Sequence, residues 1–117
     1  MTDINDQKLV LDMDALKAAF MGDTAIVKQI LFAFQDTFRD FQKEFETLHS
    51  DAKIIELSRL VHGLKGSSAN IRANTLATQA AELQQQIDQE QDYTQTYRHL
   101  LVTLSRINQE IDAVIAN

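Results

Sequence analysis

Apolar residues recur every three or four positions along most of this chain, whereas strict alternation of apolar and polar residues is sustained nowhere. Spacings of three and four place side chains on one face of an α-helix, and strict alternation is typical of strands. The chain also has few helix breakers, with three glycines and no proline among its 117 residues. The pattern therefore predicts an all-α protein.

The periodicity predicts one short helix over residues 13–21 and four longer helices after it. Asp12 is the expected N-cap of the short helix, Gly22 ends it, and Asp23 caps a long second helix that runs to about residue 49. Asp51 is the expected N-cap of the third helix, and Asn74 marks the start of the fourth. The four apolar stripes are Ile26, Ile30, Phe34, Phe38, Phe41, Phe45 and Leu48; Ile54, Leu57, Val61, Leu64, Ser68 and Ile71; Leu76, Ala80, Leu83 and Ile87; and Tyr97, Leu101, Leu104, Ile107, Ile111 and Val114.

Four amphipathic helices joined by loops of a few residues predict an antiparallel up-down four-helix bundle. The short first helix is expected to cover one end of this bundle. The length predicts a single domain over residues 1–117, large enough to bury a core. The polar residues 1–10 are expected to form a loose N-terminal segment.

Composition narrows the classes of partner and compartment. A net charge of −6 argues against a nucleic-acid partner, because binding to phosphate backbones requires a basic face. The absence of cysteine excludes disulfides and thiolate metal sites and fits a reducing compartment. The polar N-terminus predicts no signal peptide, and the apolar runs are too short to cross a membrane. We expect a cytoplasmic protein without a membrane partner.

The third predicted helix carries the most informative residues of the chain. At about 100° per residue, His62 lies roughly 130° from the centre of that helix's apolar stripe, so it should face solvent rather than the core. Lys65 and Gly66 follow it by three and four residues and therefore border it. Lys65 supplies positive charge, and Gly66 leaves space where a side chain would crowd the imidazole. The alternative is a histidine buried in the core. The pattern favours a place for a phosphoryl group.

In this region the sequence resembles the histidine-containing phosphotransfer (HPt) domains. The hallmark of that family is a His, any residue, an apolar residue, Lys, Gly and two small residues, with an aliphatic residue further on. These positions are filled here by His62, Leu64, Lys65, Gly66, Ser67, Ser68 and Ile71. The resemblance also covers the order and approximate lengths of the predicted helices.

The resemblance implies a carrier in a multistep phosphorelay. His62 would accept a phosphoryl group from the aspartyl phosphate of one receiver domain and pass it to the aspartate of another. The implied partners are the receiver domains of a hybrid sensor histidine kinase and of a response regulator. The receiver would supply Mg²⁺ and most catalytic groups, so this chain would bind no cofactor and would not be an autonomous enzyme. We expect a monomer.

Three further residues complete the site that the resemblance implies. In several HPt domains a Gln twenty-two residues after the His bonds the imidazole, and that position is Gln84 here. A neutral amide can accept from Nδ1–H and leave Nε2 free, whereas a carboxylate would favour the charged imidazolium. The Lys65 ammonium can pair with phosphoryl oxygens, and Ser67 can bond them if its hydroxyl faces that side. Alternatively, Gln84 is one of three solvated glutamines.

Docking of a receiver requires apolar surface near His62. The candidates are Leu16, Phe20, Ile26, Leu60 and Gly63, of which the four with large apolar side chains could equally well pack the end of the bundle. Gly63 replaces a larger residue of many relatives and should flatten the surface beside His62.

The turn after the His helix departs from the family, because Arg72 stands where Gly is common. Either Arg72 adopts a left-handed conformation, at a cost on the order of 1 kcal/mol, or Asn70 and Asn74 form the turn instead.

Three other classes of protein fit less well. A histidine-kinase dimerisation domain usually has an acidic residue after its His and a proline five residues on, where this chain has Gly63 and Ser67. A di-iron bundle needs two Glu-x-x-His motifs, and only Glu46 to His49 supplies one. The remaining alternative is a non-catalytic helical adaptor in which His62 has no chemical role.

Overall fold

The computed structural model describes residues 10–116. The described chain is almost entirely helical and contains no strand, which confirms the all-α prediction. Its helices are α2 (Met13–Ala19), α3 (Thr24–Thr37), α4 (Phe41–Ser50), α5 (Ile54–Asn70), α6 (Asn74–Asp88) and α7 (Thr94–Ala116).

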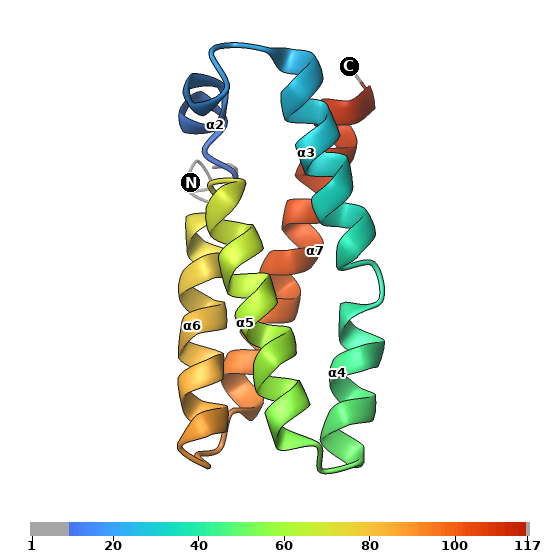
Figure 1. Ribbon diagram of the computed structural model, residues 1–117, viewed down its shortest axis with the longest axis vertical. Coiled ribbons are helices and arrows are strands. Elements are labelled where there is room, and N and C mark those ends of the chain that lie inside the picture. The colour runs from blue at the N-terminus through green and yellow to red at the C-terminus, as the bar shows by residue number, and fades with distance from the viewer. Residues whose placement is uncertain (1–9, 117) are drawn as a thin grey trace, which may run out of the picture.

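The long helices lie side by side, and from α4 to α7 they alternate in direction (Figure 1). In that view α3 and α4 descend one after the other, α5 rises, α6 descends and α7 rises behind them. The short α2 lies above the upper ends of α5 and α6. Packing is most extensive between α5 and α6. Three small residues are fully buried here, Ser68 in α5, Ala80 in α6 and Ala73 in the turn between the two helices.

The prediction of one continuous second helix is wrong, because a turn at residues 38–40 divides it into α3 and α4. The Phe38 N–H still bonds to the Phe34 carbonyl, but α4 starts afresh, with the Glu44 N–H on the Asp40 carbonyl. The apolar spacing hides this break, since Phe38 and Phe41 are both buried on either side of it and pack edge to face.

The core follows most of the predicted stripes but not all of them. The stripe of α6 is confirmed in full. In the first half of α3 the buried residues are Val27 and Leu31; Ile30 is partly buried and packs against the core as predicted, but Ile26 is exposed, so the prediction that it faces the core is wrong. Ile54 is also exposed, because it begins α5 beyond the packed region. Leu100 is fully buried in α7 and was absent from the predicted stripe.

Two predicted N-caps are confirmed and one is wrong. The carboxylates of Asp12 and Asp23 accept the N–H groups of Ala15 and Ile26 at the starts of α2 and α3. Asp51 instead ends α4, because Ala52 turns left-handed with φ 55° and α5 begins only at residue 54.

The start of the described chain is tied to two parts of the bundle. The Glu110 carboxylate accepts the N–H groups of Val10 and Leu11 at 2.8–3.0 Å, and the Asp12 N–H bonds to the Arg72 carbonyl. Val10, the last residue of the segment expected to be loose, is therefore held by hydrogen bonds, and residues 1–9 lie outside the described chain.

Candidate functional site

His62 lies in the middle of α5 and is exposed to solvent. Its neighbours on the helix, Val61 and Leu64, are fully buried and hold that face of α5 against the core. Because the helix turns about 100° per residue, burial of these two residues leaves the His62 ring on the outer surface. The predicted exposure of His62 is confirmed, and the alternative of a core histidine is excluded.

Gln84 reaches the imidazole from the neighbouring helix α6. Its side-chain oxygen Oε1 lies 3.3 Å from Nδ1 of His62. An amide oxygen can only accept, so this hydrogen bond requires the proton on Nδ1. The lone pair of Nε2 is then the free nucleophile of the neutral ring. The predicted contact between Gln84 and His62 is confirmed, and the reading of Gln84 as a solvated glutamine is not.

The side of His62 toward the end of α5 combines a cation with open space. Lys65 is partly exposed, and neither of the two ion pairs among the described residues involves it. Apart from the neighbouring backbone of its own helix, a Cβ atom added at Gly63 or Gly66 would meet no atom of the described residues within 4 Å. Helix geometry puts Gly66 about 40° and Lys65 about 60° round the axis from His62, on opposite sides of it.

The two serines of the motif have different surroundings. Ser68 is fully buried, and its hydroxyl donates to the Leu64 carbonyl at 2.6 Å. Ser67 is partly exposed but lies about 140° round the helix from His62. The geometry therefore groups His62, Lys65, Gly66 and Gln84, and does not bring Ser67 to the imidazole.

The predicted docking residues do not form one exposed patch. Leu16 is fully buried and cannot contact a partner, so its role is end-packing. Phe20 and Leu60 are partly buried and pack against the core. Ile26 is 40% exposed, and Gly63 is open to solvent.

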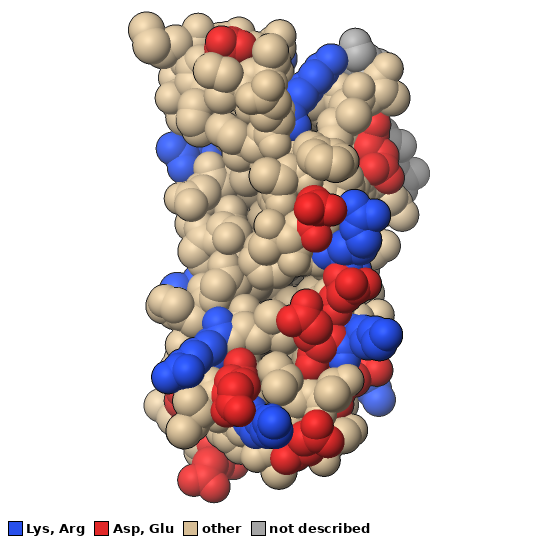
Figure 2. Space-filling view, turned by 45° about the vertical axis from the view of Figure 1, so that its right-hand side comes forward, with Lys and Arg blue, Asp and Glu red and all other residues tan. Residues whose placement is uncertain are grey.

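One apolar residue near the predicted patch was missed by the sequence analysis. Met21, in the turn between α2 and α3, is 96% exposed with φ 55°. The signal for it was its place directly before Gly22 and the N-cap Asp23, where a turn leaves a side chain outside the core. Figure 2 shows fewer charged side chains at the level of α2 and the start of α3 than at the level of α4.

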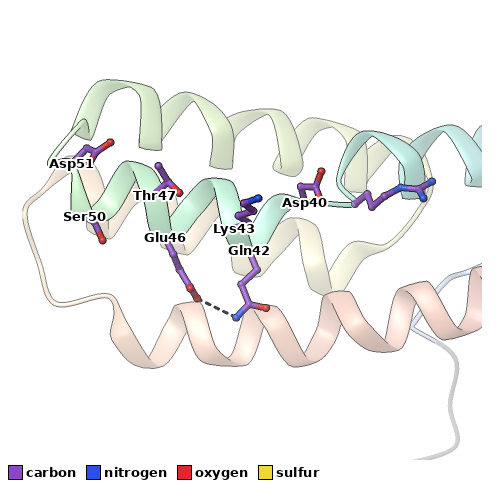
Figure 3. Close-up of a pocket in the computed structure, with 8 residues that line it drawn as sticks. Asp40, Gln42, Lys43, Glu46, Thr47, Ser50 and Asp51 are labelled. Atoms are coloured by element: carbon purple, nitrogen blue, oxygen red, sulfur yellow. Dashed lines mark hydrogen bonds between the residues drawn. The ribbon is translucent and has the colours of Figure 1, made fainter.

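A shallow hollow on the outer side of α4 lies apart from these residues (Figure 3). Its wall carries both charges, including Lys43, Glu46 and Asp51, and Gln42 donates to Glu46, one turn further along α4, at 3.1 Å. It contains no histidine, and its polar groups do not converge on one point (Figure 3). We assign it no chemistry.

The structure also bears on the di-iron alternative. His49 Nδ1 is hydrogen-bonded to the Tyr93 hydroxyl, and Glu46 accepts from Gln42 and Tyr97. Within residues 10–116 no group of three or more His, Cys, Asp or Glu side chains could hold a metal ion. No helix in this part of the chain is both long enough and apolar enough to cross a membrane.

Comparison with known protein families agrees with the site. A profile of the Hpt domain family matches residues 29–117, a range that contains His62, Lys65, Gly66 and Gln84. Comparisons with the curated proteins and with the solved structures gave no match. The match covers most of the chain, and every element described within the matched residues is a helix. The chain therefore belongs to the Hpt domain family, whose members carry phosphoryl groups on histidine in phosphorelays.

Proposed function

We propose that this protein is a phosphorelay carrier and that His62 is its phosphoacceptor. The proposal depends above all on one observation, an exposed imidazole whose Nδ1 is hydrogen-bonded to Gln84 Oε1, while its Nε2 bonds to none of the described residues. The phosphoryl group would come from an aspartyl phosphate on the receiver domain of a hybrid sensor histidine kinase. It would leave for the aspartate of a response regulator's receiver domain.

The chemistry of transfer follows from the state of the ring. The Nε2 lone pair attacks phosphorus in line with the bond to the aspartyl oxygen. A P–N bond forms, the P–O bond breaks, and the aspartate leaves as a carboxylate. The proton already on Nδ1 stays there, so the ring becomes a phosphorylated imidazolium. Gln84 Oε1 accepts a stronger hydrogen bond from this charged product than from the neutral ring.

Lys65 and Gly66 would help to bind the incoming phosphoryl group and would not act on the His62 nucleophile itself. The Lys65 ammonium can swing toward phosphoryl oxygens, because neither ion pair of the described residues holds it elsewhere. The open space at Gly66 admits the phosphoryl group and the edge of the receiver. Both contributions position and stabilise charge, which is what transfer from an activated acyl phosphate requires.

The remaining parts of the proposal concern what surrounds the carrier. The receiver would supply Mg²⁺ and the groups that stabilise the transition state, so the chain alone would turn over no substrate. With α3 and α4 taken as one broken arm, the long helices form the up-down four-helix bundle, and α2 covers one end of it. We expect the protein to act as a monomer in the cytoplasm.

The test is phosphoryl transfer from a purified receiver domain charged with acetyl phosphate. The wild-type chain should acquire an acid-labile, alkali-stable phosphate, and His62→Gln should acquire none. His99→Gln is the matched control, because His99 is also exposed on a long helix but lies on α7. Equal far-ultraviolet circular dichroism would show that all three proteins fold alike.

Two outcomes would overturn the proposal. Label retained by His62→Gln would show that another residue accepts the phosphoryl group. Failure of the wild-type chain to accept phosphate from any of a broad set of receivers, while still binding one of them, would favour the non-catalytic adaptor.

A further inference from the structure

Two side-chain hydrogen bonds join α5 to α6 in the described part of the chain. One is the contact between His62 and Gln84 at 3.3 Å. The other runs from the Ser58 hydroxyl to Oδ1 of Asp88 at 2.7 Å. Neither the motif around His62 nor the proposed function accounts for this second bond.

The two bonds are successive rungs on one edge of the helix pair. Ser58 precedes His62 by four residues, and Asp88 follows Gln84 by four residues. In antiparallel helices this places the second rung one turn, about 6 Å, along the axis from the first. The two bonds therefore hold neighbouring turns of the same pair of helices.

The two rungs differ in strength. A hydroxyl donating to a carboxylate at 2.7 Å has the length of a charge-assisted hydrogen bond. The contact at 3.3 Å lies beyond the usual range for a nitrogen and an oxygen. A bond that long does not hold its own geometry, so the stronger rung sets the distance between the Gln84 oxygen and the ring.

The position of Asp88 gives a second reason why Gln84 depends on this hydrogen bond. Asp88 is the last residue of α6, and Gln84 is one turn before it. A carboxylate at a helix C-terminus is repelled by the helix dipole, so Asp88 is unfavourable there for the isolated helix. The hydrogen bond from Ser58 offsets this repulsion and anchors the turn that carries Gln84.

We propose that Ser58 and Asp88 are positioning residues that hold Gln84 against Nδ1 of His62. Neither touches the phosphoryl group; they act by keeping the proton on Nδ1 and the lone pair on Nε2. Buried side chains set how α5 and α6 pack, and the bond between Ser58 and Asp88 adds a polar contact, one turn from Gln84, that holds the end of α6 against α5. The inference rests on the proposed role of His62 as phosphoacceptor.

The first measurement needs no partner protein. Two-bond ¹H–¹⁵N correlation spectra of the imidazole distinguish the Nδ1–H form of a neutral histidine from the Nε2–H form. At pH 8 the wild type should show mainly Nδ1–H at His62. Gln84→Ala should raise the Nε2–H fraction, and Ser58→Ala and Asp88→Ala should raise it in the same direction. Ser58→Thr keeps the hydroxyl and should restore the wild-type spectrum.

The second measurement is the rate of phosphorylation by a charged receiver. Ser58→Ala and Asp88→Ala should each slow it roughly three- to tenfold, and the double variant should be no slower than either single one. Glu82→Gln is the matched control on α6, since Glu82 is exposed and makes none of the described side-chain hydrogen bonds; its rate should equal the wild-type rate.

The outcomes separate this inference from the proposed function. If Gln84→Ala changes the ring spectrum and the rate but Ser58→Ala and Asp88→Ala change neither, the positioning role is wrong and His62 remains the acceptor. If both rung variants slow transfer without altering the spectrum, their role is structural and the inference is again overturned. If His62→Gln keeps its label, the proposed function fails, whatever the ring spectrum shows.

Discussion

Gly66 offers a test in which stability and function should move in opposite directions. A glycine within a helix costs about 1 kcal/mol relative to alanine, because its backbone loses more freedom on folding. Apart from the neighbouring backbone of α5, a Cβ at Gly66 would meet no atom of the described residues within 4 Å, so no steric cost opposes the gain. Gly66→Ala should therefore raise the free energy of unfolding by about 1 kcal/mol. For 117 residues this corresponds to a rise in melting temperature of about 4 °C.

The same added bulk should impair phosphoryl transfer, because it fills space beside the imidazole. We expect a modest loss of rate for Gly66→Ala and a loss of roughly tenfold or more for Gly66→Leu. Gly63→Ala is the matched control, since its Cβ would also meet open space in the same helix. It should give the same gain in stability with a smaller effect on transfer, because Gly63 lies about 100° from His62 round the axis.

Thermal and urea unfolding followed by circular dichroism give the stabilities, and transfer from a charged receiver gives the rates. A Gly66→Ala variant less stable than the wild type would contradict the inference that this position faces open space. Transfer at the wild-type rate by Gly66→Leu would show that the space beside His62 has no part in accepting the phosphoryl group.

Three further predictions concern other parts of the molecule. Lys65→Ala should slow transfer several-fold without changing the melting temperature, and an unchanged rate would remove Lys65 from the site. Arg72 has φ 62°, so Arg72→Gly should be more stable than Arg72→Ala by about 1 kcal/mol in urea unfolding, and equal stabilities would argue against a left-handed turn. Burial, with a smaller contribution from Glu46, raises the pKa of Tyr97, and burial also raises the pKa of Tyr93. The unfolded chain releases these phenolic protons more easily than the folded chain. The contribution of the two tyrosines to the free energy of unfolding should therefore be fully present below pH 10 and be lost as the pH rises above it. Tyr97→Phe should reduce this fall in alkaline unfolding experiments, and an identical pH dependence would refute the assignment.

The arrangement of the motif around His62 could be predicted from the sequence because it depends only on residues close together in one helix. Residues three and four apart in a helix are neighbours whatever the helix packs against, so Lys65 and Gly66 had to border His62. Burial of Leu57, Val61 and Leu64 followed from the same periodicity and was confirmed. The bond from Gln84 depended on family resemblance, because nothing in the periodicity of α6 specifies which turn of α5 it faces.

The errors lie where periodicity carries no information. The aromatic stripe continues from Phe34 to Phe45 across the turn at residues 38–40, so an unbroken pattern concealed a broken helix. Ile26 and Val27 are both apolar and adjacent, and in the folded chain Val27 is buried whereas Ile26 is exposed. In the same way, Leu16 could face a partner or the core, and the position of α2 over the bundle buried it.

The turn after α5 shows the same division between local and tertiary causes. Arg72 takes the left-handed conformation itself, and Asn70 and Asn74 remain helical, which corrects the alternative in which they form the turn. The Arg72 guanidinium donates to the Ala69 carbonyl at 3.1 Å, and its own carbonyl accepts the Asp12 N–H. These bonds offset a backbone cost on the order of 1 kcal/mol, and the second of them involves a residue sixty positions away in the chain.

By itself the sequence determined that the chain is helical, that His62 faces outward, and that the Lys65 ammonium and the open space at Gly66 lie beside it. Those properties depend on residues within one or two turns, whose relative positions the helix fixes. Only the tertiary structure decided which groups of α6 meet α5, namely Gln84 on the imidazole and Asp88 on Ser58. The rotation and register of two packed helices depend on how all their buried side chains fit together, and no local spacing records that fit.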